Sequence, residues 1–247
     1  MEMTSRMTEV TEPFSHVQKA AAWVVHAVTA SGVVLGLMAL LALVDSNPKG
    51  CLLWLGAALL VDGVDGTLAR KFSVKRVLPN FDGATLDLVI DYLTYVFIPA
   101  IFIYRFIPLP GPLELVAVAF ILLSALYCFC NVNMKSNDNY FVGFPAVWNV
   151  VAMYLFILDL DPEMTFGLIT IFAIMTFTTA KFVHPFRVPH LMPVNIAMTA
   201  VWMISSLLLI LRQPDDPVIL MVPWIVSSAW FTGICAWRTV LGYKRGM

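Results

Sequence analysis

Long runs of apolar residues, separated by short polar connections, repeat along the chain. A helix needs about 20 apolar residues, with a range of about 17 to 25, to cross a hydrocarbon core of roughly 30 Å. Polar or proline residues interrupt or bound the fifth, sixth and eighth runs. The pattern predicts about eight transmembrane helices, at approximately residues 20–44, 51–70, 84–106, 113–131, 143–160, 163–182, 191–211 and 217–240.

Composition supports a bilayer as the solvent of this chain. Its 247 residues are 60% hydrophobic and 13% charged, with a mean hydropathy of +0.84. That is too much apolar surface for one soluble core. We therefore expect an all-α, polytopic integral membrane protein in which residues 1–247 form a single transmembrane domain.

Basic residues in the short loops predict the orientation, because Lys and Arg are retained on the cytoplasmic side. With eight spans and a cytoplasmic N-terminus, twelve of the 15 Lys and Arg residues fall inside, and Lys49, Arg105 and Arg212 fall outside. Both termini are thus expected in the cytoplasm. Residues 1–19 form a polar N-terminal segment, of which 11–19 suit either a short interfacial helix or a flexible tail.

Four aspartates interrupt the second and third runs, at LLVDGVDGTLARK and FDGATLDLVIDYLTYVF. An aspartate at a helix centre costs about 2.5 to 3.5 kcal/mol on insertion scales, so such groups need partners and are functional by default. Asp62 and Asp65 are three residues apart, and Asp87 and Asp91 are four apart. Each pair therefore projects from one face of its helix.

The depths of the two pairs match. Asp62 and Asp91 lie roughly 12 Å, and Asp65 and Asp87 roughly 6 to 8 Å, from the basic connection between the helices at 1.5 Å per residue. Two antiparallel helices would bring the four carboxylates together. A bound divalent cation, or two, is the simplest compensation for their repulsion, and carboxylate ligands favour Mg²⁺ or Mn²⁺ over zinc.

Small residues and one arginine surround these acids. Gly66 and Ala69 clear one side of the second helix, and Gly83 clears the start of the third. Arg70 adds a guanidinium fork suited to phosphate. The small residues suit either close approach of a substrate or simple helix packing.

The pattern resembles the signature of the CDP-alcohol phosphotransferases: Asp62-x-x-Asp65-Gly66-x-x-Ala69-Arg70, twelve residues, then Gly83-x-x-x-Asp87-x-x-x-Asp91. The long interval is similar to that of bacterial phosphatidylcholine synthases, as are the segments KSNDNYFVGFPAVWN (135–149) and FVHPFR (182–187). Asn139 and Ala146 depart from the histidine and serine expected there.

The resemblance implies roles for these residues. Asp62, Asp65 and Asp87 would coordinate two Mn²⁺ or Mg²⁺ ions, and Asp91 would be both a ligand and the general base. The cytidine diphosphate part of CDP-diacylglycerol would be held by Gly66, Ala69 and Arg70, with Gly83 beside it.

The same resemblance implies transfer of the phosphatidyl group to choline, with release of CMP. It also implies a homodimer in the bacterial inner membrane whose active site faces the cytoplasm. Membrane lipid is an expected partner and nucleic acid is not.

Choline carries a quaternary ammonium that aromatic faces recognise, with help from a nearby anion. Tyr95, four residues after Asp91, is the first candidate; Trp148 is another, and Asp138 is a candidate anion. Aromatic side chains in membrane spans more often serve in packing or interfacial belts. His184 and Arg187 are expected to contact donor phosphates or lipid headgroups, or to act as positive-inside anchors.

Two other functions fit parts of the pattern. The acceptor alcohol can be serine, inositol or glycerol phosphate, although a phosphorylated acceptor should require more cations within the spans. A cation transporter would also place acids in the membrane, but usually over several spans rather than at one side of two consecutive helices. Release of CMP separates these classes.

Overall fold

The computed structural model describes residues 14–215 and 217–244, and the regular elements of this part of the chain are helices apart from two short strands. The prediction of an all-α, polytopic membrane protein is confirmed. Residues 1–13 of the predicted N-terminal segment lie outside the described residues, and its last residues open the first span. Among the described residues, six segments are long and apolar enough to cross a membrane: His16–Val44, Pro48–Lys71, Gly83–Phe106, Gly111–Cys130, Met192–Arg212 and Val218–Leu241.

The predicted fifth and sixth spans are shorter than expected. They are α7 (Trp148–Leu158, 11 residues) and α8 (Pro162–Met175, 14 residues). Helices of this size are roughly 16 and 21 Å long, less than the roughly 30 Å of a hydrocarbon core. The fifth predicted span begins as a helix at Trp148 rather than at 143, because the residues between β1 and α7 are not helical. The sixth ends at Met175 rather than at 182, where β2 lies.

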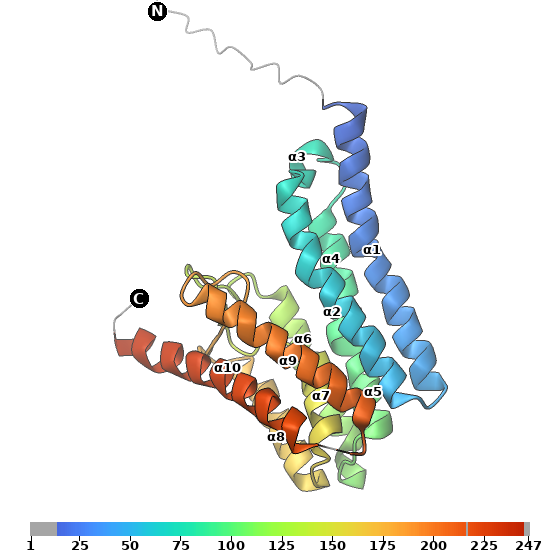
Figure 1. Cartoon of the computed structure of the whole chain (residues 1–247), viewed down its shortest axis with the longest axis vertical. Coiled ribbons are helices and arrows are strands. Elements are labelled where there is room, and N and C mark those ends of the chain that lie inside the picture. Colours follow the sequence, from blue (N-terminus) through green and yellow to red (C-terminus); the bar gives the residue numbers. More distant parts are fainter. Residues whose placement is uncertain (1–13, 216, 245–247) are drawn as a thin grey trace, which may run out of the picture.

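The N-terminal half forms a tall bundle, which carries the aspartates (Figure 1). Side chains of Ser15, Asn47 and Asp82 accept hydrogen bonds from the first turns of α1, α2 and α4 and thereby define where these helices start. After α4 the chain continues as one unbroken helix through a π-helical segment, η1, into α5. The bounds are α1 His16–Val44, α2 Pro48–Lys71, α3 Val74–Val77, α4 Gly83–Asp91, η1 Tyr92–Phe97 and α5 Ile98–Phe106.

Glycines on α1 allow α4 and η1 to approach closely. A Cβ added to Gly32 would lie 2.7 Å from Ile90 Cγ2, and one added to Gly36 would lie 3.2 Å from Leu93 Cδ2. Helices α1, α4 and η1, which lie around the aspartates, are therefore closely packed.

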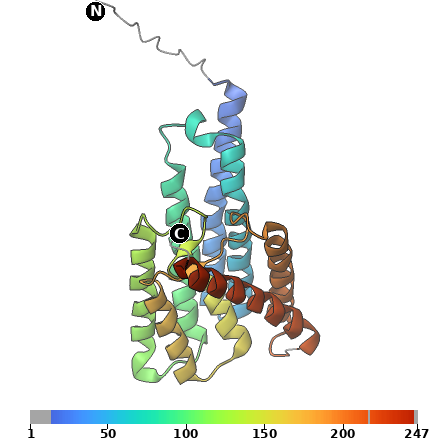
Figure 2. The ribbon, with the colours of Figure 1, turned by 90° about the vertical axis from the view of Figure 1, so that its left-hand side faces the viewer.

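The C-terminal half stands beside this bundle and stops short of its upper end (Figures 1 and 2). Antiparallel strands β1 and β2 pair Phe141 with Phe182, and so join the connection before α7 to the connection after α8. The remaining bounds are η2 Gly111–Leu113, α6 Glu114–Cys130, β1 Phe141–Val142, β2 Lys181–Phe182, α9 Met192–Arg212 and α10 Val218–Lys244.

Candidate active site

Three of the four predicted aspartates converge. Asp62 on α2 and Asp87 and Asp91 on α4 each offer a carboxylate oxygen within 4.8 Å of the other two. All three side chains are half-buried. The spacing of three and four residues produces this meeting, because it keeps each acid on the side of its helix that faces the other helix.

Asp65 lies at the same place but deeper. It is 6% exposed and lines a small cavity of about 10 Å³ together with Thr29 of α1 and the other three acids. Such a volume is about that of one water-sized sphere. Thr29 is a neighbour that sequence reasoning missed; the available signal was a polar residue in the first span, one turn after His26.

The donor set fits a hard divalent cation. Among the side chains that the structure describes, the single ion pair is Arg238–Asp138, so none of the four acids is paired with a cation there. Like charges at such short range repel strongly in a medium of low dielectric constant. Clustered carboxylate oxygens are the ligands that Mg²⁺ and Mn²⁺ prefer.

Tyr95 contacts the cluster through its hydroxyl group, which donates a 2.6 Å hydrogen bond to Asp62 Oδ2. The ring is only 8% exposed. Tyr95 lies in the π-helix that directly follows Asp91, and single π-helical turns are frequent at functional sites. The bond leaves Asp62 Oδ1 available to a metal ion. The predicted contact of Tyr95 with choline stays a prediction.

Two arginines flank Gly66. A Cβ added at Gly66 would lie 3.5 Å from Arg70 Nη1 and 3.6 Å from Arg187 Nη2, although these arginines belong to distant parts of the chain. Arg70 also donates a 3.0 Å hydrogen bond to Thr67 Oγ1. The bare backbone of Gly66 therefore lies between two guanidinium groups, an arrangement suited to a phosphate.

His184 lies among the same cations. Burial of its side chain, together with the charges of Arg187, Lys135 and Arg70, lowers the pKa of the imidazole to about 4. The ring stacks on Phe141 at 5.6 Å, and its buried Nδ1 has no hydrogen-bond partner within the described part of the chain. At neutral pH the imidazole is therefore uncharged and has a free polar atom.

Gly83 and Ala69 pack toward α1. A Cβ at Gly83 would lie 2.6 Å from His26 Cε1, and Ala69 lies against a small apolar cluster that includes Val25 and Val74. The roles predicted for Gly83 and Ala69 in donor binding stay predictions. His26 is a second neighbour that sequence reasoning passed over, since a lone histidine gave no pattern.

Asp138 and Trp148 have partners of their own. Burial alone would raise the pKa of Asp138, but hydrogen bonds from Arg238 and Ser136 lower it and keep the carboxylate ionised. Trp148 is fully buried against Phe144 at a ring distance of 5.2 Å. Tyr95 and Trp148 belong to the same buried hydrophobic cluster. The predicted contacts of Trp148 and Asp138 with choline stay predictions.

Several known proteins resemble this chain over most of its sequence. No family model matches it. A protein of Pseudomonas aeruginosa named phosphatidylcholine synthase is 66% identical over 223 residues, which are 90% of this chain and 94% of that protein. Proteins of the same name from Agrobacterium fabrum and Bradyrhizobium diazoefficiens are 36% and 42% identical, over 90% and 76% of this chain and 94% and 71% of theirs. The chain belongs to the phosphatidylcholine synthase family.

Proposed function

We propose that this protein is a phosphatidylcholine synthase, which transfers the phosphatidyl group of CDP-diacylglycerol to choline and releases CMP. The observation that carries the proposal is the convergence of Asp62, Asp87 and Asp91 beside a glycine flanked by two arginines. The names of the relatives support choline as the acceptor. The scarcity of cations within the spans agrees with a cationic alcohol.

Donor binding follows from the charges around Gly66. Arg70 and Arg187 would hold the diphosphate from two sides, and the missing side chain would let it approach the α2 backbone. Lys135 and Arg187 are close enough to Asp87 for their charges to act on its carboxylate. The diphosphate would therefore lie next to the acidic cluster, with its acyl chains in the bilayer.

The aspartates would hold one or two Mg²⁺ or Mn²⁺ ions, with Asp62, Asp65, Asp87 and Asp91 as the ligands. Such ions supply Lewis-acid stabilisation of the transferring phosphoryl group. Tyr95 would keep the Asp62 carboxylate in one orientation. A carboxylate held in this way would need little rearrangement to bind a metal ion.

Asp91 would accept the proton of the choline hydroxyl. The choline oxygen then forms a bond to the phosphorus attached to diacylglycerol, and the bond from this phosphorus to the CMP oxygen breaks. CMP leaves with the electron pair, and the proton stays on Asp91 until it passes to water. In-line placement of the two oxygens and proton removal are what phosphoryl transfer requires of its side chains.

We place the protein in the bacterial inner membrane, with the cluster on the cytoplasmic side. The support is the distribution of Lys and Arg, together with the bacterial relatives. The homodimer implied by the family resemblance stays a prediction, to be checked by light scattering of the purified protein in detergent.

A headgroup-exchange assay tests the function. Purified protein in liposomes receives CDP-diacylglycerol, Mn²⁺ and one labelled alcohol: choline, serine, inositol or glycerol 3-phosphate. We expect label in lipid from choline alone, with equimolar CMP, and loss of both with EDTA. Incorporation of a different alcohol would identify that alcohol as the acceptor and leave the transfer chemistry unchanged. If none of the four alcohols leads to release of CMP, the protein is not a transferase of this kind, and the cation-transporter hypothesis would explain the aspartates instead.

A further inference from the structure

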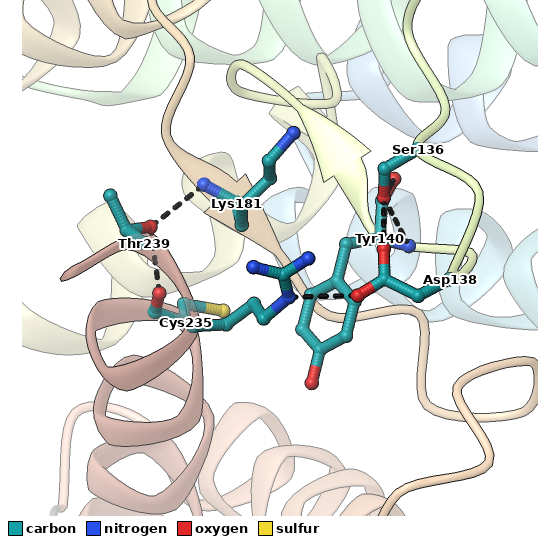
Figure 3. Close-up of polar contacts among 7 residues, drawn as sticks. Ser136, Asp138, Tyr140, Lys181, Cys235 and Thr239 are labelled. Carbon is teal, nitrogen blue, oxygen red and sulfur yellow. Dashed lines mark hydrogen bonds and ion pairs between the residues drawn. The ribbon is translucent and has the colours of Figure 1, made fainter. Parts of the chain in front are cut away.

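Three side chains of α10 bond to the two connections that carry the basic residues of the site, and Figure 3 shows the contact of Thr239 with Lys181. We call residues 131–147 and 176–191 the cap. Thr239 Oγ1 accepts a 2.8 Å hydrogen bond from the backbone N–H of Lys181, and Cys235 Sγ accepts one of 3.3 Å from Val183. Arg238 Nε donates a 2.7 Å bond to Asp138 Oδ2. Positions 235, 238 and 239 share one helix face.

The bonds to Lys181 and Val183 lie on the free edge of β2. Lys181 is paired in register with Val142 of β1, but its N–H group and that of Val183 bond to side chains of α10 and so point away from β1. An edge strand of this length has little support of its own. Side chains of α10 therefore provide the outer edge of the two-stranded sheet with its hydrogen-bond partners.

The Thr239 hydroxyl is oriented for this task. It donates its own proton to the carbonyl of Cys235 at 2.8 Å, which leaves its lone pairs to accept from Lys181. The Arg238 side chain is also fixed, since it lies 5.7 Å over the Tyr140 ring while it binds Asp138. Ser136 holds the other oxygen of Asp138 at 2.6 Å.

Both halves of the cap lead to the cations near Gly66. The backbones of Lys135 and Phe141 form an isolated antiparallel β-bridge. The Lys135 ammonium lies 5.8 Å from the centre of the Phe141 ring, and the His184 ring stacks on the same ring. His184 directly follows the anchored Val183, and Arg187 is three residues further on, with its guanidinium beside Gly66. A shift of β2 or of the 135–141 hairpin would move these cations relative to the aspartates.

We propose that the Thr239, Arg238 and Asp138 contacts are a clamp by which α10 positions the basic cap for binding of the donor diphosphate. The three are positioning residues, which act through Arg187, His184 and Lys135. The proposal rests on the proposed function, because it assigns the diphosphate to these cations. Asp138 thereby belongs to the clamp, in place of the choline contact expected from its sequence position.

The test compares Thr239→Val with Thr239→Ser, which keeps the hydroxyl. Loss of one neutral hydrogen bond should raise the Kd for CDP, measured by calorimetry, and the KM for CDP-diacylglycerol by about three- to tenfold. The KM for choline and kcat at saturating donor should stay near wild type. Thr239→Ser should resemble wild type in both measurements.

A double-variant cycle tests the ion pair separately, in case Thr239→Val does not fold. Arg238→Gln and Asp138→Asn should each weaken CDP binding, and the double variant should lose no more than the stronger single variant. Additive losses would overturn the clamp. So would normal CDP affinity in both Thr239→Val and Arg238→Gln, or a parallel rise of both KM values with a lower melting temperature.

Failure of the clamp and failure of the function give different results. If the wild type binds CDP but forms no lipid from choline, the proposed acceptor is wrong and the CDP measurements still decide the clamp. If the wild type binds no CDP, the donor site is wrong and the clamp is overturned with it.

Discussion

The hydroxyl of Tyr95 and the carboxylate of Asp62 form a 2.6 Å hydrogen bond that joins the π-helix after α4 to α2. Partners that orient a metal ligand in this way typically change metal affinity or activity by about 10- to 100-fold when removed. The bond places the Tyr95 hydroxyl on a carboxylate that would hold the metal ion.

We therefore predict that Tyr95→Phe weakens Mn²⁺ binding by about tenfold or more. Calorimetry on the purified protein without substrates measures this directly. Tyr104→Phe, at an exposed position on α5, is the matched control. Because phenylalanine keeps the aromatic face, an unchanged Mn²⁺ affinity combined with a higher KM for choline would instead support the predicted choline contact.

Asp91→Asn should abolish transfer while leaving the fold intact. The amide cannot accept the proton of the alcohol, and loss of a general base typically costs about 10²- to 10⁴-fold in rate. Asp159→Asn, at an exposed helix end whose φ of 41° asparagine tolerates, controls for removal of a negative charge. Single-turnover rates at saturating donor separate this effect from weaker binding, and activity above one tenth of wild type would contradict the role.

Gly66→Ala and Gly63→Ala make a matched pair on α2. Alanine at Gly66 would occupy the space between the Arg70 and Arg187 guanidinium groups, whereas a Cβ at Gly63 meets nothing within 4 Å. Both should stabilise the helix by up to about 0.5–1 kcal/mol. Gly66→Ala alone should raise the KM for CDP-diacylglycerol several-fold. Equal KM values in the two variants would exclude close approach of the donor to Gly66.

His184 should make the fold sensitive to acid. Its pKa is lowered to about 4, mainly by burial and then by the charges of Arg187, Lys135 and Arg70, while the unfolded chain titrates near 6.5. The unfolded state therefore binds more protons between these values, so stability is complete above about pH 6.5 and falls as pH drops toward 4. Melting temperatures from pH 7.5 to 4.5 should fall less steeply in His184→Asn. Identical slopes would show that this imidazole does not titrate as described.

Local spacing was enough to predict the carboxylate cluster. The interval of three or four residues sets the face of a helix, and the short basic connection makes the two helices antiparallel. Asp62, Asp87 and Asp91 meet for that reason. The approach of Arg187 to Gly66 depends on how β2 is anchored, which no short-range pattern encodes.

The lengths of α7 and α8 show a limit of hydropathy. Both helices are apolar, but Gly143, whose φ is 83°, and Pro145 lie in the non-helical connection that precedes α7. An alanine there would bring its Cβ against the Thr176 carbonyl. The apolar residues near 143 and 182 therefore belong to the cap. Hydropathy averaged along the sequence nevertheless assigns them to membrane spans.

The cap contacts α2 at Gly66, while α2 continues to Lys71 and α3 lies beyond it (Figure 1). Asp65 of the acidic cluster directly precedes this contact, and the C-terminal half stops short of the upper end of the bundle (Figure 1). Of the proposed substrates, CDP-diacylglycerol is confined to the membrane, whereas choline is dissolved in the aqueous phase. The encounter frequency with the donor is then governed by its mole fraction in the membrane, whereas that with choline follows bulk concentration, so dilution with inert lipid should slow the enzyme even when the total amount of donor is held constant.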